Sequence, residues 1–221
     1  MRPGTSGTPD HVAVIGDIHG EDTALHTILR FLHATARFDA ILCTGDVPDK
    51  RGGGTAADRC CERLAKYEVL TVRGNHDRWY CDKRGMSAGS GDDTAPMSDE
   101  GNHFLASLPP TLRFETSRGT LLLCHGLGTD DVAGISPGGD DDAIAHTLRV
   151  KELDSYRFIV AGHTHERMAC RTGATTLINP GSLCSDNSPG FFTLDFPAGT
   201  ALWHRVLPST QAITKGETLA L

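Results

Sequence analysis

The chain has 221 residues, of which 38% are hydrophobic and 22% are charged, and its formal net charge is −7. This length supports one sizeable core, so we expect a single domain over residues 1–221, with its core at about 11–207 and tails at 1–9 and 208–221. The acidic balance argues against nucleic acid as a partner, because phosphates bind lysine and arginine, and no apolar run is long enough to predict a membrane span.

The first half of the chain alternates strand-like and helix-like patterns. The run HVAVIGD (11–17) is an apolar strand that ends in a glycine and an aspartate. Four apolar residues then recur at the spacing of an amphipathic helix: Leu25, Ile28, Leu29 and Leu32. The same order follows with a strand at 38–46, a helix at about 55–66 and a strand at 67–77. This alternation predicts a largely parallel α/β sheet.

The second half is richer in strands. Residues 81–102 lack an apolar period and are rich in Gly, Ser and Asp, so we expect a long exposed loop. A hairpin is expected over 112–126, a second loop over 128–142 and a short helix over 143–152. Five further runs read as strands: 156–165, 166–170, 174–182, 190–196 and 200–207.

Polar residues follow several of these strands at the point where each one ends. Four segments share this pattern, namely GDIHG (16–20), GNHD (74–77), CHG (124–126) and GHTH (162–165), and GDVPD (45–49) adds two aspartates in the same position. Because the carboxyl ends of parallel strands share one edge of a sheet, these side chains should converge in space. Carboxylate oxygens and imidazole nitrogens together suit manganese, iron or zinc. The sequence therefore predicts a metal site.

In this order the five motifs resemble those of the calcineurin-like metallophosphoesterases, over roughly residues 11–182. The resemblance implies a four-layer α/β/β/α sandwich of two mixed β-sheets flanked by helices. It also implies an enzyme that hydrolyses a phosphomonoester or phosphodiester at a dinuclear metal site, by attack of a metal-bridging hydroxide on phosphorus.

The resemblance also implies a role for each motif residue. Seven residues would bind the metal ions: Asp17, His19 and His165 the first, Asn75, His125 and His163 the second, and Asp46 both. His76 would assist the leaving group, and Asp49 would pair with His76 and raise its basicity. Lys50 or Arg51 is the candidate for contact with the substrate phosphate, and the sequence does not choose between them.

The subfamily signals point in two directions. GDVPDKRG resembles the GDxxDRG of protein serine/threonine phosphatases and bis-nucleoside tetraphosphatases, but has one extra residue before the glycine. GHTH followed by NPGS (179–182) resembles the small bacterial phosphodiesterases. A different class is a catalytically silent scaffold of the same fold, but the complete set of seven ligand positions together with His76 favours an enzyme.

The expected cofactors are two divalent metal ions, manganese first, with iron, zinc or nickel as alternatives. A small phosphorylated molecule or a phosphoprotein is the expected partner, and neither a membrane nor nucleic acid is expected. The seven cysteines are odd in number and have no C-x-x-C spacing, so a reducing, cytoplasmic setting fits best. The oligomeric state stays open.

Overall fold

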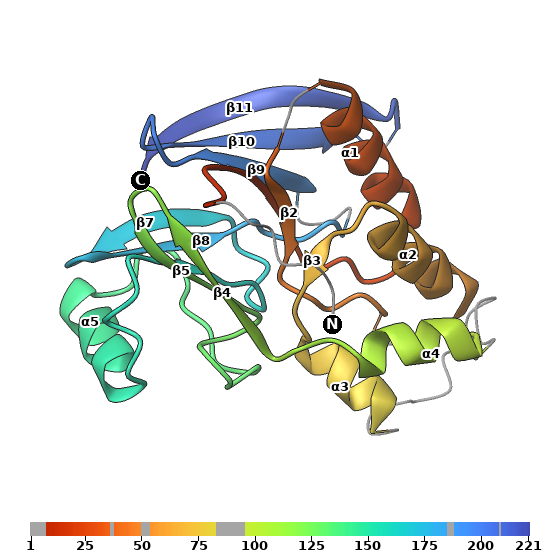
Figure 1. Ribbon diagram of the computed structural model, residues 1–221, viewed down its shortest axis with the longest axis horizontal. Helices are drawn as coiled ribbons and strands as arrows, with labels where there is room; N and C mark the ends of the chain where they lie inside the picture. The colour runs from red at the N-terminus through yellow and green to blue at the C-terminus, as the bar shows by residue number, and fades with distance from the viewer. Residues whose placement is uncertain (1–7, 36–37, 50–53, 83–95, 185–187, 208) are drawn as a thin grey trace.

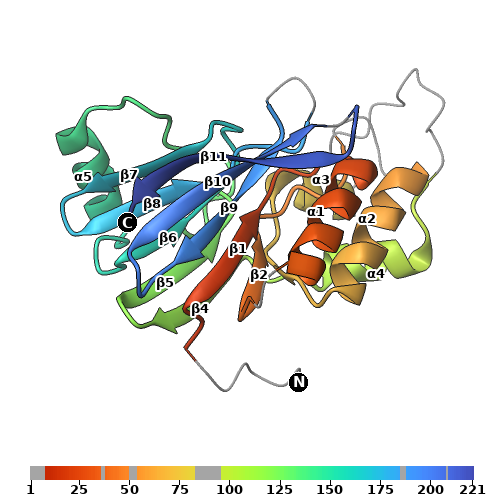
Figure 2. The same cartoon turned by 90° about the horizontal axis from the view of Figure 1, so that it is seen from above.

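Two mixed β-sheets are stacked between two layers of helices (Figures 1 and 2). The computed structural model describes residues 8–35, 38–49, 54–82, 96–184, 188–207 and 209–221. The helices in this part are α1 (Asp22–Thr35), α2 (Gly54–Lys66), α3 (Asn75–Cys81), α4 (Asp99–Ala106) and α5 (Asp141–Val150).

The first sheet has the spatial order β11-β10-β9-β1-β2-β3. Its strands are β1 (His11–Ile15), β2 (Ala40–Cys43), β3 (Leu70–Thr71), β9 (Gly190–Asp195), β10 (Thr200–Leu207) and β11 (Ala212–Ala220). The second sheet has the order β4-β5-β6-β8-β7. Its strands are β4 (Thr111–Thr116), β5 (Gly119–Cys124), β6 (Phe158–Val160), β7 (Met168–Thr172) and β8 (Thr175–Asn179).

Three apolar layers hold these sheets and helices together. Ile15 packs with Leu25 and Leu29 of α1 on one face of the first sheet. The opposite face of the same strand presents Val12 and Val14 to the second sheet, where side chains of β5 and β6 meet them. Helix α5 covers the outer face of the second sheet. Strand β1 is therefore buried on both faces, which explains its continuous apolar run and confirms the predicted four layers.

The central strands run parallel in both sheets. In the first sheet β1 pairs with β2, and β2 with β3; in the second sheet β5 pairs with β6, and β6 with β8, all in parallel. The carboxyl ends of these strands therefore leave each sheet at one edge, where the polar motifs of the sequence begin.

The prediction of a C-terminal tail is wrong. Residues 212–220 form β11, which pairs antiparallel with β10 from Ala212 opposite Leu207 to Ala220 opposite Thr200. Most of β11 is exposed, and the register shifts between Leu202 and His204. An edge strand with a bulge shows no regular apolar alternation, which is why its sequence did not predict a strand.

The strand predicted at 67–77 is also wrong in its second half, because the strand ends at Thr71 and α3 begins at Asn75. A helix of seven residues is too short to show an apolar period in the sequence. The end of the predicted loop at 81–102 is helical as well, since α4 begins at Asp99 and Ser98 caps it by accepting a hydrogen bond from the Gly101 N–H at 3.0 Å. Residues 83–95 of that loop lie outside the described part. Among the described helices, none is long and apolar enough to cross a membrane.

Candidate metal centre

The polar residues that follow the parallel strands meet at one edge of the two sheets. Asp17 and His19 follow β1, Asp46 follows β2, and Asn75 opens α3 just beyond β3. From the second sheet, His125 follows β5, and His163 and His165 follow β6. Asp17, Asp46, Asn75 and His125 are buried. The structure thus brings together all seven residues that the sequence predicts as metal ligands.

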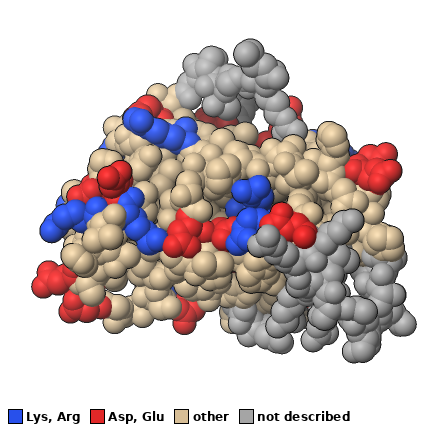
Figure 3. All heavy atoms as spheres, turned by 90° about the horizontal axis from the view of Figure 1, so that it is seen from below, with Lys and Arg blue, Asp and Glu red and all other residues tan. Residues whose placement is uncertain are grey.

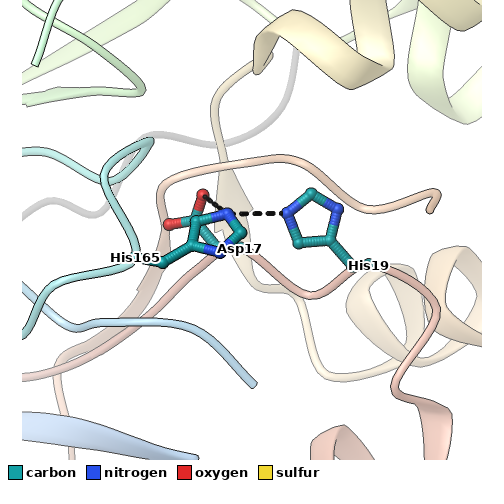
Figure 4. Close-up of side chains that lie close together, drawn as sticks. All are labelled: Asp17, His19 and His165. Carbon is teal, nitrogen blue, oxygen red and sulfur yellow. Dashed lines mark hydrogen bonds and ion pairs between the residues drawn. The ribbon is translucent and has the colours of Figure 1, made fainter. Parts of the chain in front are cut away.

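The first group consists of Asp17, His19 and His165 (Figure 4). The Nε2 atoms of His19 and His165 lie 3.0 Å apart, and His165 Nε2 lies 3.4 Å from Asp17 Oδ1. Burial lowers the pKa of His19 and so favours its neutral form, whereas the hydrogen bond to Asp17 raises the pKa of His165. Two ring nitrogens and a carboxylate oxygen that face one point form the donor set that a divalent cation requires.

The second group consists of Asn75, His125 and His163. Oδ1 of Asn75 lies 2.9 Å from His125 Nε2 and 2.9 Å from His163 Nδ1. Nδ1 of His125 donates to the main-chain carbonyl of Thr44 at 2.8 Å, so the lone pair of the neutral ring is on Nε2. Hydrogen bonding alone favours the amide turned so that Nδ2 faces the two ring nitrogens, whereas Oδ1 in that place needs a cation between it and the ring lone pairs. This donor set therefore also fits a divalent metal.

The Asp46 carboxylate lies between the two groups. Its Oδ2 is 3.8 Å from His19 Nε2 in the first group and 3.4 Å from His125 Nε2 in the second. Burial by itself raises the pKa of Asp46 and lowers that of His125, but the contact between the two outweighs burial. The pKa of Asp46 is consequently held below its usual range and that of His125 above it. A shared carboxylate at this position can contact cations in both groups.

The backbone is strained at most of the ligand positions. Five of the seven ligands have a positive φ: Asp17 (46°), His19 (48°), Asp46 (54°), His163 (69°) and His165 (60°). Residues with a side chain rarely adopt this left-handed conformation, and each such residue costs about 1–3 kcal/mol. Strain of this kind persists where the surrounding structure enforces it. The fold therefore orients these side chains towards the centre at a cost in local stability.

Two glycines of the motifs are required by close approach of neighbouring segments. A Cβ on Gly162 would lie 2.5 Å from both Asp17 Oδ2 and Thr44 Oγ1, and one on Gly74 would overlap the Asp46 carboxylate. The motifs therefore begin with glycine because two loops cross where the ligands converge.

Asp77 supports the loops of the centre, a role that the sequence analysis did not assign to it. Its fully buried carboxylate accepts hydrogen bonds from the main-chain N–H groups of Asp46 and Val47, both at 2.9 Å, and of Gly74 at 2.7 Å. Burial, followed by the nearby Asp46, raises the pKa of Asp77 to about 6. Asp77 ties the loop that carries Asp46 to the start of α3, and its place in GNHD is the signal that could have identified it.

The segment NPGS also supports the centre. Ser182 Oγ donates to the carbonyl of Asp17 at 2.9 Å. Asn179 Nδ2 donates to the carbonyl of Gly162 at 2.9 Å and to Thr164 Oγ1 at 3.0 Å. This segment therefore holds the main chain next to ligands from both sheets.

His76 lies at the rim of the centre and is half-buried. The main-chain N–H of His76 donates to Asp46 Oδ1 at 2.8 Å. The centroid of the His76 ring lies 4.8 Å from that of His19 and 5.1 Å from that of Trp79. The predicted pairing of Asp49 with His76 stays a prediction; Asp49 is also half-buried. The carboxylate of Asp46 lies close to the His76 ring, together with His19. Lys50 and Arg51 lie outside the described residues.

Comparison with known sequences assigns the family. The sequence profile of the calcineurin-like phosphoesterase superfamily domain matches residues 11–198. No curated protein sequence matches the chain.

Solved structures share the fold at low sequence identity. A metallophosphoesterase from Sphaerobacter thermophilus superposes with a TM-score of 0.66 at 20% identity, over 90% of this chain and 89% of that one. A mutant of Vps29 from Entamoeba histolytica has a TM-score of 0.59 at 22% identity, over 96% and 99%. Yfce, a phosphoesterase from E. coli, has a TM-score of 0.55 at 21% identity, over 95% and 98%. Because the family profile covers most of the chain, this protein belongs to the calcineurin-like phosphoesterase superfamily.

Proposed function

We propose that the chain is a metal-dependent phosphoesterase that hydrolyses a phosphomonoester or a phosphodiester at this centre. The observation that carries the proposal is the position of Asp46, a buried carboxylate between two groups of donors. Family membership supports it, because the family is defined by phosphoesterases.

Each residue of the centre would have a defined role in binding metal. Asp17, His19 and His165 would bind one ion, and Asn75, His125 and His163 the other, with Asp46 in contact with both. When bound, divalent ions supply positive charge opposite the phosphate oxygens and lower the pKa of water. The Thr44 carbonyl fixes the tautomer of His125, so that its Nε2 is free to act as a ligand.

His76 would donate a proton to the oxygen of the leaving group. The hydrogen bond from its N–H to Asp46 holds the start of α3 next to the ligands, and the half-buried ring remains accessible to a substrate. We expect Asp49 to support His76, and Lys50 or Arg51 to contact the phosphate.

The nature of the substrate and cofactor follows from donor chemistry and charge. Nitrogen and oxygen donors favour manganese, with iron, zinc or nickel as alternatives. On the face shown in Figure 3, basic and acidic residues are interspersed over the part that the structure describes, which supports a small phosphorylated molecule or a phosphoprotein over nucleic acid. All seven cysteines are free thiols, which supports a cytoplasmic location.

The test compares p-nitrophenyl phosphate with bis-p-nitrophenyl phosphate on metal-stripped protein before and after reloading with manganese. We expect turnover only after reloading and a loss of turnover in Asp46→Asn, and the preferred ester identifies a monoesterase or a diesterase. Turnover that survives both metal removal and Asp46→Asn would refute the proposal.

The second candidate is a catalytically silent scaffold of the same fold. The observation that favours it is the structural similarity to Vps29 proteins as well as to phosphoesterases. Protein that binds two ions and turns over neither ester with any divalent metal would support this candidate instead.

A further inference from the structure

Two segments that carry ligands of the second group are joined by an ion pair. Arg78 lies on α3, one turn after Asn75, and Asp131 lies in the loop that follows His125. Arg78 Nε donates to Asp131 Oδ2 at 2.6 Å, and Arg78 Nη2 donates to Asp131 Oδ1 at 2.8 Å. The side chains are only 29% and 19% exposed. A two-point contact of this kind fixes direction as well as distance, unlike an ordinary surface pair.

The loop at 126–134 contacts the neighbourhood of every ligand in the second group. It folds back onto Gly126, the residue after His125, where a Cβ would lie 2.6 Å from the Ala133 carbonyl. The carbonyl oxygen of Asp131 abuts Asn75, because it lies 3.3 Å from the side-chain amide atom that faces the two histidines. Gly134 lies against His163, and a Cβ there would be 3.5 Å from His163 Cδ2. A shift of this loop would therefore disturb all three ligands.

We propose that Arg78 and Asp131 are positioning residues for the second metal ion. Their ion pair holds the loop at 126–134 against α3, so that Asn75, His125 and His163 face a common point. The first group receives no ligand from either segment, because Asp17, His19 and His165 come from other loops. The pair should thus act on one ion more than on the other. This inference rests on the proposed function, because it requires that the centre binds metal.

A second ion pair on the same loop provides a matched control. Lys151 Nζ donates to Asp130 Oδ2 at 2.7 Å, and this pair links the loop to the end of α5 rather than to α3. Removing this pair also deletes one positive or one negative charge, at a lysine as exposed as Arg78 and an aspartate more exposed than Asp131, but it does not release the contact with the helix of Asn75. Any effect that is specific to the Arg78 pair must therefore come from its position.

The experiment titrates manganese into the metal-stripped full chain. Asp131→Asn keeps the side-chain shape and Arg78→Gln keeps a shorter polar side chain, and each loses the ion pair. Lys151→Gln and Asp130→Asn are the controls. We expect Arg78→Gln and Asp131→Asn to bind the first ion as the wild type does and the second ion about 10–100-fold more weakly. This is the typical cost of losing a residue that orients a metal ligand. The controls should stay within about twofold. Arg78→Lys should give an intermediate affinity, because it keeps the charge and loses the two-point contact.

Manganese electron paramagnetic resonance provides a readout that a purely structural role would not change. At sub-saturating manganese, the wild type should give the signal of two coupled manganese ions. Asp131→Asn should give the signal of a single, isolated manganese ion. Unchanged affinities with a lower melting temperature would overturn the inference and leave a stabilising ion pair. Equal weakening of both ions would also overturn it. A wild type that binds no manganese would instead refute the proposed function.

Discussion

Two buried histidines in different regions of the molecule, His125 and His204, have pKa values shifted in opposite directions. His125 is 1% exposed at the sheet edge, and the nearby Asp46 carboxylate raises its pKa despite burial. His204 is 4% exposed within β10, and there burial lowers its pKa to about 4. The His204 ring stacks on Phe191 at 4.6 Å and 6°, and Nε2 lies 2.9 Å from Thr193 Oγ1.

The difference lies in the neighbours rather than in burial. His125 faces an amide oxygen and a carboxylate, so its lone pair points into a site where further positive charge is favourable. His204 faces rings, and its Nδ1 has no hydrogen-bond partner among the described residues. A buried histidine thus indicates a metal site only where other donors converge with it.

Replacing His125 and His204 in turn by phenylalanine tests this comparison directly, and His125→Phe should show the largest effect of all. His125→Phe removes a ligand and leaves the buried Asp46 without its partner, so we expect kcat/KM of the manganese enzyme to fall by about 10³-fold or more. His204→Phe should stay within about twofold. The measurement is kcat/KM together with manganese bound per chain. Retained metal binding in His125→Phe would contradict the assigned second group.

His76→Ala sharpens the comparison at the rim of the centre. A proton donor to the leaving group typically contributes about 10²–10⁴-fold, so kcat should fall by about 10²-fold or more for an alkyl phosphate. For p-nitrophenyl phosphate the fall should be smaller, about tenfold, because p-nitrophenolate leaves without a proton. Paired kcat values for the two substrates check this, and equal losses would argue against proton donation.

Gly162→Ala tests whether the close crossing of loops positions the ligands. Its Cβ would meet Asp17 Oδ2 and Thr44 Oγ1 at 2.5 Å, so we expect a loss of about 1–3 kcal/mol in the free energy of unfolding and weaker binding of manganese. Gly173→Ala is the control: its φ is +60°, but a Cβ there meets nothing within 4 Å. It should cost about 1 kcal/mol and leave metal affinity unchanged. Denaturant unfolding and metal titration distinguish the two.

The smallest expected effect is the pH dependence that His204 imposes on stability. Since its folded pKa is about 4 and its ordinary value is 6.5, the unfolded chain binds more protons between these values. Stability is therefore retained above about pH 6.5 and falls as the pH drops towards about 4, by on the order of 1–3 kcal/mol.

His204→Phe should remove this part of the slope, and it should do so whether or not metal is bound. His146→Gln is the control, because His146 is exposed on α5. The measurement is the free energy of unfolding at several pH values on metal-stripped protein. An unchanged slope in His204→Phe would show that the ring titrates as it does in water.

The local pattern of the sequence was informative where strands are apolar and buried. The runs of β1 and β2 and the spacing in α1 predicted the parallel half of the first sheet, and the motifs at the strand ends predicted which side chains converge. The pattern failed at β11 and α3, since one is an exposed, bulged edge strand and the other is a short helix. Neither element buries enough regularly spaced apolar surface to show a period.

Residue type and order at strand ends are local properties, so the motifs alone were enough to identify the family and, through that resemblance, to predict the α/β sandwich and the seven metal ligands. How those donors are held became visible only in the folded chain. The packed fold enforces the left-handed backbone at five ligands. The contacts of Asp77 with the N–H groups of Asp46 and Val47, and that of Arg78 with Asp131, join segments that are distant along the chain. Such contacts depend on which loops the packed sheets bring within a few ångströms, and no spacing of residues encodes that distance.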